Sequence, residues 1–116
     1  MANTVCHVEL DTTDLARAQA FYSQIFDWTF RQFTDNMLAI GSGDAHLGGL
    51  MLVSQVEPGK SPSIWIQVDD IDETLAKVQG LGGSVVTEKG PVPHVGWSAQ
   101  FSDLDGNSVG IVQFES

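Results

Sequence analysis

Hydrophobic and polar residues alternate along several short stretches of the chain, and each such stretch predicts a β-strand. In residues 5–10, His7 and Glu9 fall on one face of the predicted strand, while Val8 and Leu10 fall on the other. A strand with two polar groups on one face turns that face toward water or toward a polar pocket. Alternation also predicts strands at residues 28–33 and 84–88. Turns and loops bound five further predicted strands, at residues 37–40, 47–53, 64–68, 97–102 and 109–114.

Two other stretches repeat their apolar residues at helical spacing. Asp14 can cap a helix that begins at Leu15 and ends near Phe26, and Asp70 can cap a second helix that begins at Ile71. Glycines at positions 80, 82 and 83 end the second helix. The predicted apolar stripes are Leu15, Ala18, Tyr22 and Ile25 in one helix and Ile71, Leu75, Val78 and Leu81 in the other.

The order strand, aspartate turn, helix and three strands occurs twice, which predicts an internal duplication. Residues 7–10 match residues 63–66 in register from the strand to the start of the helix. The segment between the two copies is rich in proline and glycine, as linkers are. We therefore expect one domain over residues 1–116, made of module one (1–56), a linker (57–62) and module two (63–116).

Two adjacent glycines, Gly48 and Gly49, interrupt the strand predicted at residues 47–53. Glycine is costly inside a strand, because it has no side chain to pack and loses much conformational freedom. A bulge, a bend or a closely approaching ligand would explain the pair. The sequence leaves these three explanations open.

Charge and composition narrow the classes of partner. The chain has 116 residues, of which 15 are acidic and 5 are basic, so its net charge is −10. That charge repels nucleic acid and anionic membranes, and no cluster of Lys or Arg counteracts it. The apolar runs are too short to cross a bilayer. The single cysteine, Cys6, fits a reducing compartment. We expect a cytoplasmic protein with no nucleic-acid or membrane partner.

The stretch from His7 to Trp28 resembles the opening of the vicinal oxygen chelate superfamily (glyoxalase, bleomycin resistance protein and extradiol dioxygenase). Residues 68–72 (VDDID), 81–83 (LGG) and 101–107 (FSDLDGN) support the resemblance, which covers essentially the whole chain. The resemblance implies an α+β fold, in which two βαβββ modules form a half-open mixed β-barrel with the helices packed outside. It also implies a homodimer, the common state of such proteins.

The resemblance further implies where a metal ion would bind. Glyoxalase-like members hold a divalent ion with four side chains, typically His, Glu or Gln, from the first and last strands of the two modules. His7 falls on one of these positions, whereas Ser63, Gly110 and a glycine of the pair 48–49 occupy the others. We therefore expect no metal cofactor. A shifted site that uses His7 with Glu9 leaves a divalent metal as the less favoured alternative.

Strand alternation places several polar and aromatic residues on the predicted pocket face. His7 and Glu9 are candidate catalytic residues, since a carboxylate can orient a histidine that acts as hydrogen-bonding anchor or general base. The candidate ligand-binding residues are His7, Glu9, Ser63, Trp65, Gln67, His94 and Trp97; the last two lie in and after a loop, residues 90–93, that rims the cavity in the superfamily.

Each candidate also has a purely structural interpretation. A histidine paired with Glu9 can be a satisfied surface group, and Trp65 can be part of the core. His94 and Trp97 can be exposed loop residues, and His46 is expected to be a solvated residue in a turn. No phosphate-binding glycine loop, Ser-His-Asp order or zinc-ligand spacing occurs in the chain.

Two functions from different classes follow from these observations. The favoured one is a metal-independent protein that binds a small organic molecule of aromatic or amphipathic character between its tryptophans. The alternative is an enzyme, a metal-dependent lyase, isomerase or dioxygenase, that uses His7 and Glu9. The missing ligand positions favour the binding protein.

Overall fold

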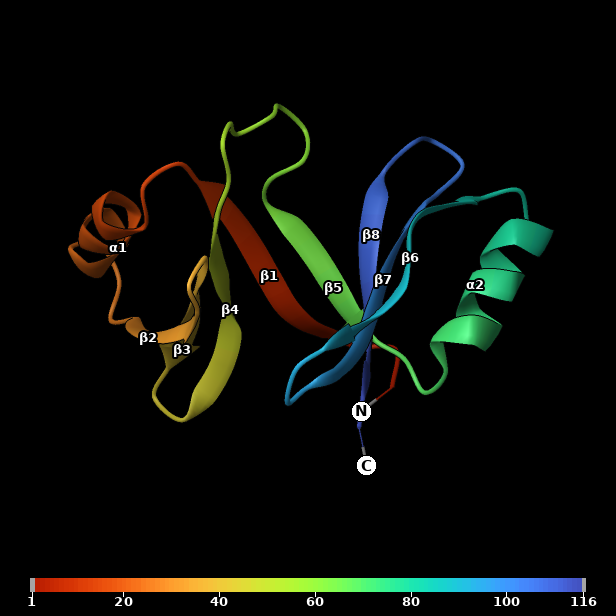
Figure 1. Ribbon diagram of the computed structural model, residues 1–116, viewed down its shortest axis with the longest axis horizontal. Helices are drawn as coiled ribbons and strands as arrows, with labels where there is room; N and C mark the ends of the chain where they lie inside the picture. Colours follow the sequence, from red (N-terminus) through yellow and green to blue (C-terminus); the bar gives the residue numbers. More distant parts are fainter. Residues whose placement is uncertain (1, 116) are drawn as a thin grey trace. The chain divides into compact units, whose positions relative to one another are not determined.

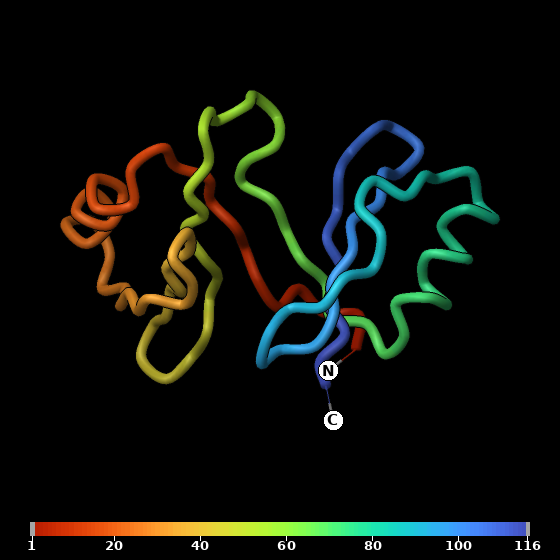
Figure 2. Tube along the Cα trace, in the orientation of Figure 1, coloured from red at the N-terminus to blue at the C-terminus, as the bar shows by residue number. Residues whose placement is uncertain are grey.

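The computed structural model describes residues 2–115, and these residues form two compact units. One unit is Cys6–Ser63, and the other consists of the chain from Ile64 onward together with the residues up to Val5. Two backbone hydrogen bonds hold the start of the chain in the latter unit: Asn3 N–H donates to the Gln67 carbonyl (2.6 Å) and Gln67 N–H donates to the Thr4 carbonyl (2.8 Å). Figure 2 traces the path of the chain through each unit.

Module one contains one helix and a four-stranded mixed sheet (Figure 1). The strands lie in the order β2-β3-β4-β1, with β1 parallel to β4 and the other neighbours antiparallel. Residues of the helix pack on one face of this sheet, around a core of Leu38, Ile40 and Leu50. The elements are β1 (Val5–Thr12), α1 (Leu15–Ser23), β2 (Thr29–Thr34), β3 (Met37–Ser42) and β4 (Ala45–Leu52).

Module two repeats this plan. Its strands lie in the order β5-β8-β7-β6, with β5 parallel to β8, and its helix covers a core of Val68, Ile71, Ala99 and Ile111. The predicted α+β class and the two βαβββ modules are thus confirmed. The elements are β5 (Ser63–Gln67), α2 (Ile71–Gly80), β6 (Ser84–Val92), β7 (Gly96–Ser102) and β8 (Ser108–Phe114).

Both predicted helix caps are confirmed. The Asp14 carboxylate accepts a hydrogen bond from Arg17 N–H (3.0 Å), and the Asp70 carboxylate accepts one from Glu73 N–H (3.1 Å). Each carboxylate satisfies a backbone donor of the first turn that has no partner within its helix.

Two element boundaries differ most from the prediction. Helix α1 ends at Ser23 instead of near Phe26, where the ring of Phe26 stacks on Trp28 with centroids 4.7 Å apart. Strand β6 continues to Val92 through the segment predicted as a loop, because this segment pairs with the start of β7. Neither helix of residues 2–115 is long and apolar enough to cross a membrane.

Candidate functional site

The face of module one opposite its helix carries the chemistry-bearing side chains. Strand β1 places His7 and Glu9 on this face, as alternation predicts, and the neighbouring strands add Arg31 from β2 and His46 from β4. We call the sheet surface formed by His7, Glu9, Arg31 and His46 the polar face.

A bulge in β4 brings His46 to the polar face. Ile40 pairs with Gly48, but the next residue of β3, Gly41, pairs with His46, so Leu47 is an extra residue. In a regular ladder His46 would point toward the helix, because one residue of shift moves a side chain to the other face. The predicted turn position of His46 is therefore wrong, because this residue lies within strand β4 and contacts His7. His46 is nevertheless exposed to solvent, as the sequence predicted.

Gly48 permits the close approach of β4 to β1 beside the bulge. A Cβ atom at this position would stand 1.8 Å from the Val8 carbonyl oxygen, so no other residue fits without a shift of the backbone. Of the three explanations that the glycine pair left open, the bulge is the one observed. The absent side chain at position 48 therefore helps to position the histidine two residues earlier.

The three ionisable groups nearest β1 form a chain of hydrogen bonds. Nε2 of His7 lies 3.2 Å from Oε2 of Glu9, and Nδ1 of His7 lies 2.9 Å from Nε2 of His46. The two imidazole rings stack with centroids 5.1 Å apart. With Glu9 ionised and His7 neutral, Nε2 of His7 donates to the carboxylate and Nε2 of His46 donates to Nδ1 of His7. This assignment makes Nδ1 of His46 a hydrogen-bond acceptor.

Electrostatics favour a neutral His46. Partial burial lowers the pKa of His46 below its ordinary value, and the charge of His7, whenever His7 is protonated, and the charge of Arg31 lower it further. Burial has the opposite effect on the carboxyl of Asp11, whose pKa is raised by desolvation and by the nearby charge of Glu9. The polar face thus combines a neutral imidazole with a permanently charged guanidinium.

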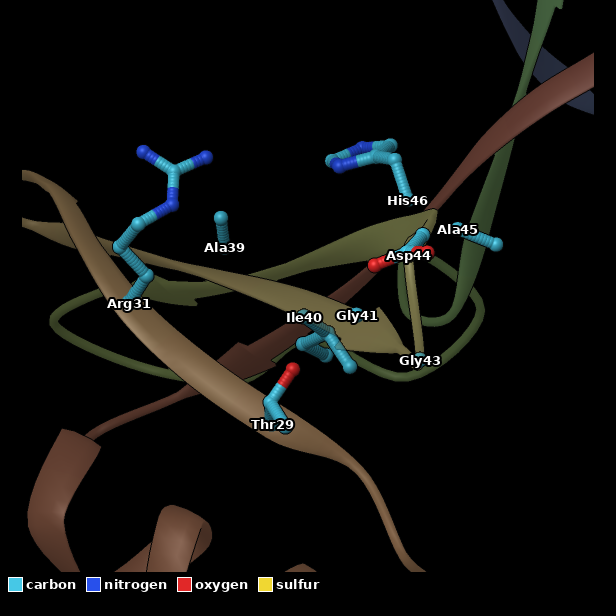
Figure 3. A pocket seen from close by; sticks show the side chains of 9 residues that line it. All are labelled: Thr29, Arg31, Ala39, Ile40, Gly41, Gly43, Asp44, Ala45 and His46. Carbon is cyan, nitrogen blue, oxygen red and sulfur yellow. The ribbon is translucent and has the colours of Figure 1, made fainter.

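A shallow cavity of about 200 Å³ lies on the polar face (Figure 3). Figure 3 shows Arg31 and His46 on the same side of the sheet, with Ala39 between them and Asp44 near the base of His46. Arg31 forms no ion pair with a carboxylate among residues 2–115. The lining residues are Thr29, Arg31, Ala39, Ile40, Gly41, Gly43, Asp44, Ala45 and His46.

Module two carries apolar groups at the matching positions. Glu9 pairs with Gly49 in module one, and Trp65 pairs with Gly110 in module two, so Trp65 stands where module one has Glu9. A Cβ atom on Gly110 would lie 2.2 Å from the indole ring of Trp65. The ring therefore covers the glycine. The other predicted β5 residues, Ser63 and Gln67, are half-buried on the same face as Trp65.

The remaining two predicted residues do not join this face. Trp97 packs against the core under α2, on the face of the module-two sheet opposite Trp65, and Lys89 Nζ lies 5.3 Å from the centre of its ring. His94 is exposed in the turn after β6 with a positive φ of 66°. Trp65 and Trp97 therefore cannot hold one ligand between them.

The superfamily's metal site does not fit the residues present. Glycine stands at two of the implied ligand positions: Gly110 lies under Trp65, and a Cβ atom on Gly49 would lie 2.4 Å from the methyl group of Met37. Within the described part of the chain, no three His, Cys, Asp or Glu side chains are arranged to hold a metal ion. The imidazoles of His7 and His46 bond to each other and do not converge on one point.

The resemblance seen in the sequence is supported by a family model. The model of the Glyoxalase/Bleomycin resistance protein/Dioxygenase superfamily matches residues 4–111. The chain belongs to this superfamily. Membership fixes the scaffold and leaves the reaction open, because this scaffold supports several chemistries.

Among curated proteins, superfamily relatives are named for glyoxylase activity. A Mycobacterium tuberculosis protein named "Putative glyoxylase CFP32" is 32% identical over 117 residues, which cover 91% of this chain and 44% of that protein. A Didymella fabae "Glyoxylase-like domain-containing protein" is 29% identical over 110 residues, covering 87% of this chain and 86% of its own. The chain thus spans less than half the length of the mycobacterial relative.

Solved structures share the superfamily fold at low sequence identity. A hypothetical protein from Bacillus halodurans superposes with a TM-score of 0.78 at 15% identity, covering 100% of this chain and 97% of its own. Methylmalonyl-CoA epimerase from Mycobacterium tuberculosis gives 0.76 at 14% identity, with 97% and 89% covered. The Mn(II)-bound glyoxalase from Novosphingobium aromaticivorans gives 0.71 at 18% identity, with 97% and 39% covered. These likenesses establish the fold alone.

Sequence reasoning missed two members of the polar face. Arg31 follows Phe30 in a regularly alternating strand, so its face could have been assigned once the pairing of β2 with β3 was known. His46 could not be placed by alternation, because the bulge at Leu47 reverses the side on which it points. The only signal of that bulge in the sequence is the glycine pair that follows it.

Proposed function

We propose that this chain is a small-molecule-binding member of the superfamily, and that it binds its ligand on the polar face of module one without a metal ion. The observation that carries the proposal is the hydrogen-bonded chain His46–His7–Glu9 beside Arg31, at a cavity of about 200 Å³. A concave site with a few fixed polar groups is the usual form of a small-molecule site. The metal-free part rests on the glycines at positions 49 and 110, which supply no ligand atoms.

Hydrogen bonding preorganises the polar face. His7 is held between Glu9 and His46, so neither ring has to be ordered when a ligand arrives. Ordering a flexible side chain on binding costs about 0.5–1.5 kcal/mol, and a preformed contact avoids that cost. The small volume restricts the ligand to the size of a simple metabolite, below the roughly 300–1,000 Å³ of pockets for drug-sized molecules.

A thermal-shift screen of the full chain tests the proposal. Protein treated with chelator is mixed with a panel of small acids, amides and alcohols, and separately with MnCl₂ or ZnCl₂. A ligand that binds only the folded state at about 100 times its Kd adds about 2.7 kcal/mol of stability, so a clear rise in Tm is expected for some organic compound without added metal. The rise should disappear in Arg31→Gln or His46→Phe but persist in Arg17→Gln, a matched change at the other arginine, on helix α1.

Metal analysis tests the metal-free part of the proposal. Protein purified without chelator should contain no stoichiometric divalent ion. One divalent ion per chain, together with compound binding that requires it, would overturn the metal-free proposal.

A second candidate function is proton transfer, as in a lyase or isomerase that uses His7 and Glu9. The specific observation in its favour is that the three groups are aligned for proton relay: a proton taken up at Nδ1 of His46 lets Nε2 of His46 pass its own proton to Nδ1 of His7. Glu9 then stabilises the charged His7. Solvent exchange distinguishes this function from binding alone. In D₂O, the wild-type protein should catalyse the exchange of the α-hydrogen of a bound acid for deuterium. The Glu9→Gln variant should not catalyse this exchange.

A further inference from the structure

The cavity on the polar face presents a cation at one end. Arg31 lies on β2, the edge strand of the module-one sheet, opposite Ala39 of β3. The chain has 15 acidic residues, yet none of those described pairs with this guanidinium. A guanidinium offers planar, paired donors that match the two oxygens of a carboxylate. The Arg31 end therefore fits a carboxylate group.

The other end of the cavity presents acceptors. Nε2 of His46 is engaged with His7, and Nδ1 of His46 makes no hydrogen bond with a described residue. When a neutral His7 donates from Nε2 to Glu9, the hydrogen of His46 lies on Nε2, and Nδ1 of His46 accepts. The carboxylate of Asp44 lines the same end and also accepts. A hydroxyl group satisfies these acceptors, whereas a second carboxylate would be repelled by Asp44.

Building on the proposed binding function, we propose that the cavity takes a small hydroxy acid, with its carboxylate on Arg31 and its hydroxyl on His46. The cavity volume of about 200 Å³ supports a ligand of this size. Since a water molecule takes about 30 Å³ in the liquid, the cavity corresponds to roughly six or seven waters. The methyl group of Ala39, between the two polar ends, accommodates the carbon chain of the ligand (Figure 3).

An NMR titration of the full ¹⁵N-labelled chain tests this assignment with matched probes. The hydroxy acids are glycolate and lactate. Acetate and propionate lack the hydroxyl, and glycolamide and lactamide lack the negative charge. Glycolate or lactate should shift the amide signals of residues 29–31, 39–41 and 43–46 and bind at least tenfold more tightly than either kind of control.

Three variants separate the two ends of the site. Arg31→Gln should lower the affinity for the hydroxy acids at least tenfold and leave the affinity for the amides unchanged. Arg31→Lys should retain part of the affinity for the hydroxy acids. His46→Phe should abolish the preference for lactate over propionate. Arg17→Gln, which removes one positive charge from α1, should have no effect, so a general charge effect is excluded. A melting curve of each variant verifies that it is folded.

The outcomes distinguish failure of this inference from failure of the proposed function. If hydroxy acids bind no better than amides, or if Arg31→Gln leaves their affinity unchanged, the hydroxy-acid assignment is overturned. When a neutral compound of the screen still shifts the polar-face signals, the binding function stands without this assignment. If no compound shifts those signals, both are overturned.

Discussion

The two modules have the same strands and the same register but opposite chemistry on the sheet face away from the helix. In module one, Glu9 faces Gly49 and forms part of a polar chain with His7 and His46. In module two, Trp65 faces Gly110 and lays its indole ring over it. A duplicated scaffold can therefore devote one copy of a position to packing and the other to hydrogen bonding.

The difference extends to how each glycine is covered. Gly49 is covered by the end of the flexible Met37 side chain, which can move, whereas Gly110 is covered by a rigid ring. A methyl group added at the two equivalent positions should therefore have unequal consequences. This contrast is the sharpest way to test the comparison between the modules.

The largest effect is expected for Gly110→Ala. The new methyl group would lie 2.2 Å from the Trp65 ring, so the ring must leave its position. Overpacking of this kind costs about 1–3 kcal/mol, and we expect the upper part of that range. The free energy of unfolding from urea denaturation measures it. In the double variant with Trp65→Leu the loss should be smaller than the sum of the single losses, because the clash is removed.

Gly49→Ala is the matched control in module one. The methyl group would clash with the terminal carbon of Met37, 2.4 Å away, which can rotate aside, and its next neighbours lie 3.4 Å away. We expect a loss of at most about 1 kcal/mol, near the low end for overpacking. Equal losses at Gly49 and Gly110 would contradict the difference drawn between the two coverings.

Most of the scaffold could be predicted from the sequence, because it depends on local signals. The aspartates at positions 14 and 70 cap their helices as predicted, and the repeated order of elements indicated both modules. The polar face was predicted only in part. His7 and Glu9 follow from strict alternation, whereas His46 depends on a bulge, which alternation cannot represent. Trp97 was misplaced because β6 extends through the expected loop and pairs with β7.

The next prediction, with a smaller expected effect, is that His46 makes the stability of the folded chain depend on pH. Because its pKa is lowered in the folded chain, the unfolded chain binds more protons below the ordinary value of 6.5. The stability of the folded state is therefore unaffected above that pH and falls as the pH drops below it. The Tm of His46→Gln should decline less than that of wild-type protein between about pH 7.5 and pH 5.5. Parallel declines would show that His46 does not titrate in this way.

The smallest effect lies at the matching place in module two. Asn107 precedes Gly110 by three residues, as His46 precedes Gly49, but it closes a turn instead of facing a cavity. The Asp103 carboxylate accepts hydrogen bonds from Asn107 Nδ2 (2.9 Å), Asn107 N–H (2.9 Å) and Asp105 N–H (2.9 Å). These bonds, those from Asn107 foremost, lower the pKa of Asp103 below its ordinary value of 3.8.

A depressed carboxyl pKa contributes stability above the unfolded value, and this contribution is lost as the pH falls through the folded value. Asp103→Asn removes the charge but keeps a side-chain acceptor, so its Tm should be slightly lower than that of wild-type protein at about pH 7. The two melting temperatures should converge at a pH low enough for the wild-type carboxyl to be protonated as well. A Tm difference that is the same at both pH values would mean that the turn depends on the shape of Asp103 and not on its charge. In that case the charge of Asp103 would not stabilise the module-two turn, and a pH-dependent contribution to stability would be left to His46 of module one.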